Sequence, residues 1–205
     1  MDPRPELTET YDAHAQHRED RGEPAWRDAA KADLVRRLGP GARLLELGAG
    51  VGYTSRWFAD RGLDVLATDL SPVHVEYCRA KGLEARVADM LDLDFADGCF
   101  DAVWAASCLM HVPSDRLSGM LGSIARILTP DGLFWTGTWG AETGSEGIWE
   151  DDQLRPKRFY SIRTDDQLLA ALRAHFEVLT FEATRPEPEF DWHYQMALAT
   201  PLGKH

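Results

Sequence analysis

A turn with glycine at every second position constrains the fold of this chain more than any other segment. The short apolar run Arg43–Leu47 leads into Gly48, Gly50 and Gly52, and a helical pattern follows as far as Ala59. Glycine lets the backbone turn tightly and lets a ligand approach where a Cβ would intrude. The N–H groups at the start of the following helix are free to bind a carboxylate or a phosphate. The segment therefore predicts a strand–turn–helix unit with a ligand site at its turn.

Short apolar runs alternate with helical patterns along most of the chain. Helices are predicted between these runs, and Ser71 and Ser114 stand where each would cap one of them. Strands are predicted at residues 43–47, 64–69, 84–89, 100–106, 133–138, 176–183 and 191–199. A strand–helix–strand order gives parallel pairing with right-handed crossovers, and near-continuous apolar strands fit a sheet covered on both faces. We therefore expect an α/β fold, with a doubly wound, mostly parallel seven-stranded sheet, helices on both faces (a three-layer sandwich) and an antiparallel strand near the C-terminus.

The composition excludes several classes of protein. The 205 residues fit one domain, and a net charge of −12 gives no general attraction to phosphate backbones, so nucleic acid is not expected as a substrate. No run of about 18 apolar residues could span a membrane, and the polar start lacks the apolar core of a signal peptide. The three cysteines form no C-x-x-C pair, as in proteins of a reducing compartment. We therefore expect a cytoplasmic protein, a monomer or a homodimer, that acts on a small molecule.

Acidic residues stand at the ends of the next two predicted strands. Asp69 ends the second strand, where a carboxylate can accept both hydroxyls of a ribose. Asp89 ends the third strand, where it can accept the amino group of an adenine, and Met90 beside it offers a soft apolar contact. The carboxyl ends of parallel strands meet at one edge of a sheet, so these groups and the glycine turn predict an adenosine site.

The glycine spacing indicates which adenosine compound is bound. Dinucleotide sites have the pattern G-x-G-x-x-G, whereas this turn reads G-x-G-x-G with Tyr53 where the third glycine would stand. Glu46, two residues before the first glycine, is expected to face the pocket. A carboxylate there would repel a pyrophosphate but would tolerate a ligand that carries an ammonium and a sulfonium.

The residues Leu45–Gly52 resemble the first motif of class I, Rossmann-like S-adenosylmethionine-dependent methyltransferases. Asp69, Asp89 and the segment Phe100–Val103 resemble later signatures of that family, and Leu109–Pro113 resembles the small-molecule methyltransferases of bacterial quinone and natural-product pathways. The likeness covers roughly residues 40–140. It implies S-adenosylmethionine as the cofactor and S-adenosylhomocysteine as its product. The character of the sequence divides a single domain, 1–205, into three zones: an N-terminal arm or lid (1–23), a cofactor-binding core (24–138), and substrate-side insertions with the last strands (139–205).

The resemblance also implies which residues hold the cofactor. The glycines would lie under its methionine part, Asp69 on the ribose, Asp89 near the adenine amino group with Leu70 and Met90 against the ring, and Ala105 near the methionine ammonium. The full set of cofactor candidates is Glu46, Gly48, Ala49, Gly50, Gly52, Asp69, Leu70, Asp89, Met90 and Ala105.

The residues that contact the acceptor are predicted from isolated positions in the sequence and not from a motif. His111 follows the fourth strand, and its ordinary pKa of about 6.5 suits a general base, although a rim histidine can equally hydrogen-bond the backbone and shape its loop. The other candidates for contact with the acceptor are Tyr11, His14, Trp139, Tyr160 and His193. A basic cluster at 155–158 (Arg155, Lys157 and Arg158) either grips an anionic acceptor or lies on a solvated loop. No metal site is expected, because the acidic runs at 150–152 and 165–166 lack histidines at ligand spacing.

Three classes of function follow from the sequence. The first is transfer of a methyl group from S-adenosylmethionine to an O or N atom of a small-molecule acceptor, in a biosynthetic or natural-product pathway. The second is an NAD-dependent oxidoreductase, which predicts a third glycine and a hydride-site motif such as Y-x-x-x-K, neither of which is present. The third is a non-catalytic protein that binds S-adenosylmethionine, and only turnover distinguishes it from the first.

Overall fold

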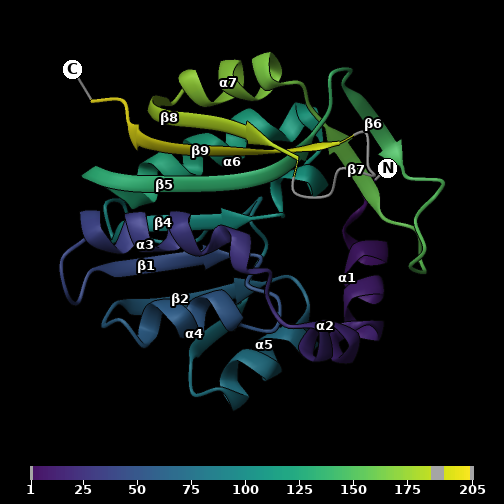
Figure 1. The fold of residues 1–205 in the computed structure, drawn as a ribbon, viewed down its shortest axis with the longest axis horizontal. Helices are drawn as coiled ribbons and strands as arrows, with labels where there is room; N and C mark the ends of the chain where they lie inside the picture. Colours follow the sequence, from purple (N-terminus) through teal and green to yellow (C-terminus); the bar gives the residue numbers. More distant parts are fainter. Residues whose placement is uncertain (1, 186–191, 204–205) are drawn as a thin grey trace.

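The computed structural model describes residues 2–185 and 192–203 and contains a seven-stranded sheet in the order β3-β2-β1-β4-β5-β9-β8 (Figure 1). Its strands are β1 (Arg43–Leu47), β2 (Asp64–Asp69), β3 (Glu84–Val87), β4 (Phe100–Ala106), β5 (Leu128–Gly140), β8 (Phe176–Thr184) and β9 (His193–Pro201). Strands β1 to β5 pair in parallel, and β9 lies antiparallel to both of its neighbours, β5 and β8. The predicted fold class is confirmed, including the antiparallel strand near the C-terminus. Residue 191, where the last strand was expected to begin, lies outside the described residues.

Helices cover both faces of the sheet and make it the middle of three layers (Figure 1). One layer contains α3 (Asp28–Arg37), α4 (Tyr53–Ala59) and α5 (Pro72–Ala80), and the other contains α6 (Ser114–Ile127) and α7 (Asp165–Arg173). Successive side chains of a strand point to opposite faces. Leu44 accordingly packs in the core cluster with α3, whereas Leu45 packs with α6 and α7. Both faces of the parallel strands are thus buried, as the apolar runs predicted.

Capping groups fix where the helices begin. Ser71 accepts a hydrogen bond from the backbone of His74 at 3.0 Å and starts α5, with Pro72 as its first residue. Ser114 does not cap α6, contrary to the prediction, because Pro113 occupies the cap position. The backbone N–H and the hydroxyl of Ser114 instead donate to the carboxylate of Glu146, which supplies the negative charge favoured at a helix N-terminus.

Two regions are more ordered than the sequence predicted. The N-terminal arm forms α1 (Arg4–Ala13) and α2 (Ala15–Arg21), and the region after β5 forms an antiparallel pair of short strands, β6 (Ser145–Ile148) and β7 (Phe159–Ile162), outside the main sheet. Two short 3₁₀ turns, η1 (Ala25–Arg27) and η2 (Leu109–His111), complete the elements of the described residues. Short helices are marginal by themselves, so the arm is ordered by contacts with the rest of the chain.

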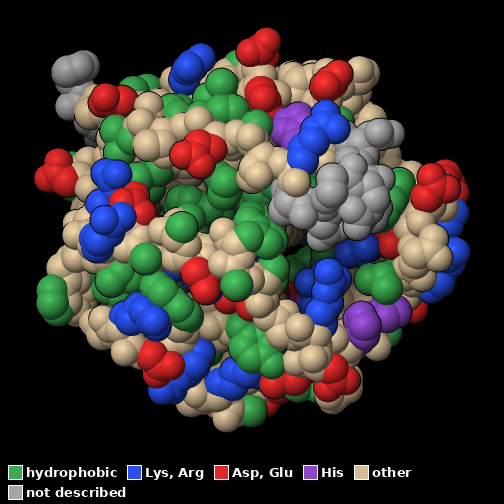
Figure 2. Space-filling view, in the orientation of Figure 1, with side chains coloured by type: hydrophobic (Ala, Val, Ile, Leu, Met, Phe, Trp, Pro, Cys, Tyr) green, Lys and Arg blue, Asp and Glu red, His purple; other side chains and the backbone are tan. Residues whose placement is uncertain are grey.

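The arm and the β6–β7 pair lie at the same end of the sheet, beyond the points of β1 and β4 (Figure 1). Within the described residues, no helix has the length and apolar character needed to cross a membrane. Acidic and basic side chains are interspersed over the described part of the face in Figure 2, so the net charge of −12 does not gather there.

Candidate active site

A cavity of about 550 Å³ lies at the carboxyl ends of the strands, beneath the N-terminal arm. One part of its wall is formed by the glycine turn, by the end of β2 and by the residues after β3. We call this part the glycine half; it is lined by Gly48, Ala49, Gly50, Asp69, Leu70, Asp89 and Met90. The other part, the ring half, is lined by Tyr11, His111, Trp139, Trp149, Tyr160 and Trp192. The two halves belong to one cavity.

The three glycines of the turn have different neighbours. All have positive φ: +66° at Gly48, +56° at Gly50 and +87° at Gly52. A Cβ at Gly48 would lie 2.8 Å from Cys108, and one at Gly52 would lie 2.8 Å from the sulfur of Cys78, whereas one at Gly50 would meet nothing within 4 Å. Gly48 and Gly50 line the cavity and Gly52 does not. Gly50 therefore leaves the space for a ligand, and Gly52 allows the turn to pack against α5.

Asp69 is held in place at the end of β2. One carboxylate oxygen accepts the backbone N–H of Gly50 at 2.8 Å, and the other accepts that of Ser71 at 2.9 Å. Asp69, Leu70 and Ala49 all line the cavity. The strand end, the glycine turn and the start of α5 are thus tied together by one carboxylate that faces the glycine half.

Asp89 and Met90 also line the glycine half, where α1 crosses it. One oxygen of Asp89 accepts the backbone N–H of Leu91 at 2.8 Å, and the other accepts the guanidinium of Arg4 at 2.6 Å. Asp2 bonds the same guanidinium and so orients it. Arg4 was not among the site residues predicted from the sequence, because its contact with Asp89 depends on how the arm docks.

Glu46 faces the cavity, but it is only 2% exposed and accepts a hydrogen bond from the hydroxyl of Ser55. Burial raises the pKa of Glu46 to about 8, and the hydrogen bond from Ser55 opposes this rise. From the sequence, Glu46 was expected to be an ionised carboxylate at neutral pH. The structure instead favours its neutral form there, and a cation beside it would lower the pKa again.

Ala105 does not line the cavity, contrary to the expectation that it lies near a methionine ammonium. It is fully buried in the cluster that packs against α6. The next two residues, Ala106 and Ser107, line the cavity instead. The side chain of Ala105 points away from the cavity because neighbouring residues of a strand face opposite sides of the sheet.

His111 lies in the ring half and is bonded on both ring nitrogens. Its Nδ1 is 2.8 Å from the carbonyl oxygen of Phe159, and its Nε2 is 2.7 Å from the hydroxyl of Tyr11. A carbonyl can only accept, so Nδ1 carries the proton and Nε2 accepts from Tyr11. Burial lowers the pKa of His111 to about 4, which keeps the ring neutral at physiological pH.

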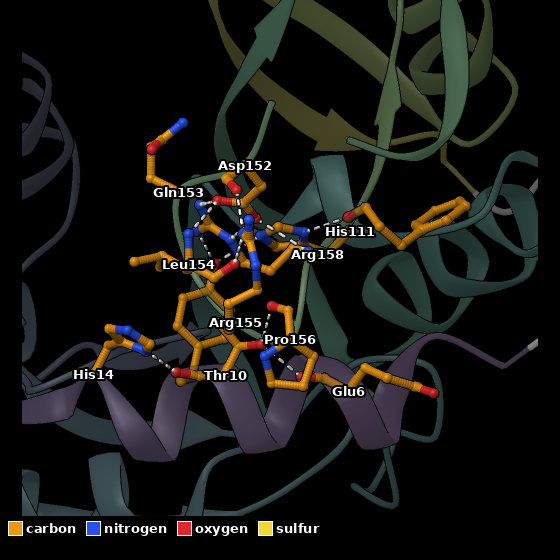
Figure 3. Close-up of polar contacts among 12 residues, drawn as sticks. Glu6, Thr10, His14, His111, Asp152, Gln153, Leu154, Arg155, Pro156 and Arg158 are labelled. Atoms are coloured by element: carbon orange, nitrogen blue, oxygen red, sulfur yellow. Dashed lines mark hydrogen bonds and ion pairs between the residues drawn. The ribbon is translucent and has the colours of Figure 1, made fainter. Parts of the chain in front are cut away.

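An ion pair lies beside this histidine. The guanidinium of Arg158 bonds both oxygens of Asp152, at 2.7 and 3.0 Å, and donates to the hydroxyl of Tyr11 at 3.3 Å. Figure 3 shows the loop from Asp152 to Arg158 over α1, with Thr10 bonded to the backbone of Pro156 at 2.6 Å. The arm and the β6–β7 loop therefore meet over the ring half.

The remaining acceptor-side candidates divide between the cavity and the rest of the molecule. Trp139 and Tyr160 line the ring half. His14 also lines the cavity, and its Nδ1 bonds the backbone oxygen of Thr10 at 2.8 Å. His193 does not line the cavity, which corrects that prediction. Its Nε2 bonds the carboxylate of Asp165 at 2.7 Å, because this face of β9 is turned toward the start of α7.

The basic cluster also divides. Arg158 lines the cavity, whereas Lys157 pairs with Glu150 at 2.5 Å and Arg155 bonds backbone oxygens of its own loop. Asp152 also lines the cavity, but it was considered from the sequence only as part of an acidic run without histidines at ligand spacing. Its one available signal was the opposite charge six residues later, which many solvated loops share.

The glycine turn, the two carboxylates at strand ends and the cavity they border define a Rossmann-like nucleoside-binding domain. Residues 45–136 match the family described as "Methyltransferase domain". A ubiquinone biosynthesis O-methyltransferase of Xanthomonas oryzae pv. oryzae is 37% identical over 117 residues, which are 54% of this chain and 46% of that protein. A sterol 24-C-methyltransferase of Gibberella zeae is 29% identical over 148 residues, which are 68% of this chain and 37% of that protein.

The likeness to one solved structure extends over nearly the whole chain. The 1,6-didemethyltoxoflavin-N1-methyltransferase of Burkholderia thailandensis has a TM-score of 0.77 and 27% identity, and the match covers 97% of this chain and 86% of that one. This chain spans less than half the length of the two curated relatives above. In its fold and over residues 45–136 the chain is thus similar to the class I, Rossmann-like S-adenosylmethionine-dependent methyltransferases.

Proposed function

We propose that this protein transfers a methyl group from S-adenosylmethionine to an O or N atom of a small-molecule acceptor in the cytoplasm and releases S-adenosylhomocysteine. The observation that carries this proposal is the single cavity beneath α1, which joins the glycine half to the ring half. A transfer reaction needs its two substrates side by side in one enclosed space, and this cavity provides that space.

The residues of the glycine half fit the cofactor. The open space above Gly50 admits the methionine part, and the carboxylate of Asp69 faces the position of a ribose. Asp89, with Leu70 and Met90, offers an acceptor and two apolar contacts for an adenine. When bound, S-adenosylmethionine supplies a methyl group already activated by its sulfonium. The chain's task is then to hold the acceptor about 3–3.5 Å from that methyl, a proximity effect that can contribute roughly 7–11 kcal/mol.

The names of the similar proteins agree on methyl transfer as the reaction but differ on the element that receives the methyl group. They describe an O-methyltransferase, a sterol C-methyltransferase and an N-methyltransferase. The chain's own residues favour a nucleophile that carries a proton, because the unprotonated Nε2 of His111 lies behind the hydroxyl of Tyr11 at the ring half. A positioned base contributes about 10²–10⁴-fold when such a proton must be removed.

Ligand-dependent melting separates this proposal from the oxidoreductase. S-adenosylhomocysteine at about 100 times its Kd should stabilise the protein by roughly 2.7 kcal/mol, whereas NAD should leave the Tm unchanged. A Tm that rises with NAD and not with S-adenosylhomocysteine would contradict the proposal.

Turnover separates the proposal from a non-catalytic binder. The measurement is formation of S-adenosylhomocysteine from S-adenosylmethionine in the presence of phenols, carboxylic acids and ring N–H heterocycles. We expect acceptor-dependent formation with at least one class. Stabilisation by the cofactor without formation of product from any of them would favour the binder.

A further inference from the structure

A continuous chain of hydrogen bonds leads from the cavity into the protein at the ring half. The Nδ1–H of His111 donates to the carbonyl of Phe159, and its Nε2 accepts the hydroxyl proton of Tyr11. The hydroxyl oxygen of Tyr11 in turn accepts from Arg158, which Asp152 holds with both of its oxygens. Figure 3 shows His111 and Arg158 side by side above α1.

The order of Tyr11 and His111 along this series of hydrogen bonds decides which of them a bound molecule contacts first. Tyr11 is half-buried and lines the cavity, and His111 is 7% exposed with its accepting nitrogen already occupied by the tyrosine hydroxyl. A molecule bound in the ring half would therefore meet the oxygen of Tyr11 before it met Nε2 of His111. The hydroxyl can accept a proton from that molecule only if it passes its own proton on.

We propose that Tyr11 is a catalytic residue that takes the proton of the acceptor and passes its own proton to Nε2 of His111; this inference rests on the proposed function. The acceptor's X–H bond breaks as its X–CH₃ bond forms, and the methyl–sulfur bond breaks with its electron pair left on sulfur. The acceptor proton goes to the oxygen of Tyr11, and the tyrosine proton goes to His111. One positive charge leaves the sulfur and one arises on the imidazole, so the net charge of the closed cavity does not change.

The charges around Tyr11 indicate the class of acceptor. The guanidinium groups of Arg18 and Arg158 lie 4.9 and 5.6 Å from the centre of its ring, and Asp152 is the carboxylate paired with one of them. Two cations and one anion favour negative charge developing on the acceptor and oppose an ammonium. The acceptor is therefore a weak acid that is neutral when it binds.

The side chains that line the ring half indicate the shape of the acceptor. Trp149, Tyr160 and Trp192 form a cluster of rings with centroids 5.0 to 5.6 Å apart, and all three line the cavity. Offset and edge-to-face contacts suit a flat conjugated ligand. The acceptor class is a planar compound with a phenolic or enolic O–H, or with a ring N–H.

The surroundings of His111 agree with its role as the receiving base. Tyr11 on α1, Arg18 on α2, Asp152 and Arg158 in the β6–β7 loop, and Tyr160 on β7 face it. Burial keeps its pKa low, at about 4, so the ring is free to accept a proton at neutral pH. The same low pKa favours release of that proton after the methyl transfer.

The first test compares Tyr11→Phe with the unaltered protein on a series of substituted phenols whose own pKa runs from about 4 to about 10. We expect kcat to fall by about 10²–10⁴-fold for the weakest acids and by less than about threefold for phenols that are already ionised. Affinity for S-adenosylhomocysteine, measured by calorimetry, should stay within twofold. His111→Gln should show the same dependence on acceptor acidity.

Tyr77→Phe is the matched control. The hydroxyl of Tyr77 bonds Gln16 on α2 at 2.7 Å, so this variant also removes a hydroxyl that ties down the arm, but away from the cavity. We expect it to have no effect that depends on acceptor acidity. An equal loss for all phenols in Tyr11→Phe would mean that Tyr11 only holds the arm, and the relay would be wrong.

A second test needs no turnover. In ¹⁵N-histidine NMR of the complex with S-adenosylhomocysteine, His111 should be protonated at Nδ1 and unprotonated at Nε2, and its Nε2 resonance should move in Tyr11→Phe but not in Tyr77→Phe. Protonation at Nε2, or an unchanged resonance, would overturn the relay. Failure of the proposed function would show differently, as a complex with S-adenosylhomocysteine that does not form.

Discussion

The two halves of the cavity are built in different ways. The glycine half takes its residues from the ends of neighbouring parallel strands and from the glycine turn, and it presents backbone groups and two carboxylates fixed by backbone N–H groups. The ring half takes its residues from α1, η2, β5, β7, the β6–β7 loop and the residue before β9, and its side chains bond and pack against one another. The first half is therefore set by the sheet, and the second is set by segments that dock onto it. Substitutions that affect one half and not the other test this difference.

The largest effect is expected in the glycine half, from Asp69→Ala. This variant removes the carboxylate that is proposed to accept both ribose hydroxyls of the ligand. Loss of these two hydrogen bonds to a charged group, at about 1.5–3 kcal/mol each, should weaken the binding of S-adenosylhomocysteine by at least about 100-fold. Asp64→Ala at the exposed opposite end of β2 is the control and should bind normally. Calorimetry measures both affinities, and circular dichroism checks that Asp69→Ala is folded. Unchanged affinity in a folded Asp69→Ala would show that the ribose lies elsewhere.

Alanine substitutions at two glycines of the turn should separate an effect on ligand affinity from an effect on folding stability. Gly52→Ala should lower the free energy of unfolding by about 1–3 kcal/mol, because its Cβ meets the sulfur of Cys78 at 2.8 Å and its φ is +87°. Gly50→Ala shares the positive φ but meets no protein atom within 4 Å, so its additional cost should fall on ligand binding. Urea titration and calorimetry on both variants measure the two effects. Equal loss of stability with equal affinity would contradict the separate roles.

The pH dependence of stability should have opposite signs in the two halves. Glu46 has a pKa of about 8 in the folded protein against an ordinary 4.5, so the folded state holds the extra proton between these values and the free energy of unfolding falls as pH rises. His111 has a pKa of about 4 against an ordinary 6.5, so the unfolded state holds the extra proton and stability falls as pH falls.

These slopes can be measured separately. Each is at most about 1.4 kcal/mol per pH unit. Between pH 4.5 and 6.5 they oppose each other, and from 6.5 to 8 only the Glu46 slope remains. Glu46→Gln should therefore flatten the urea-unfolding profile from pH 6.5 to 8, and His111→Gln should alter it below 6.5. A profile from pH 6.5 to 8 that is the same with and without Glu46 would show that this side chain is ionised in the folded protein.

The smallest effect is expected in the ring half, from Trp149→Leu. Ring contacts are worth about 0.5–1.5 kcal/mol beyond buried area, so KM for a flat acceptor should rise by about 2- to 10-fold. Affinity for S-adenosylhomocysteine should stay the same, because Trp149 lies away from the glycine half. Trp57→Leu, on α4 outside the cavity, is the control. A parallel loss of cofactor affinity in Trp149→Leu would mean that the halves are not independent.

The same difference explains what the sequence could predict. Asp69 ends β2 and Asp89 lies two residues beyond the end of β3. A parallel sheet brings such positions to one edge, so predicting the strands was enough to place them. Arg4 and Asp152 reach the cavity only through the docking of α1 and the β6–β7 loop, for which no local pattern exists. Side-chain direction was the other source of error. Ala105 and His193 lie on strands that were predicted, but on faces turned away from the cavity.

Chain order has a consequence for how the arm closes. The partners of α1 lie far along the chain: Asp89 is 85 residues from Arg4, His111 is 100 residues from Tyr11, and Pro156 is 146 residues from Thr10. During synthesis on the ribosome the arm emerges before all of these partners, and it has no complete surface to dock on until the β6–β7 loop has followed. These long-range contacts form late, because closing long loops costs entropy before the contacts stabilise them. The arm is thus made before its partners but docks after them, and the cavity is complete only once the β6–β7 loop has been made.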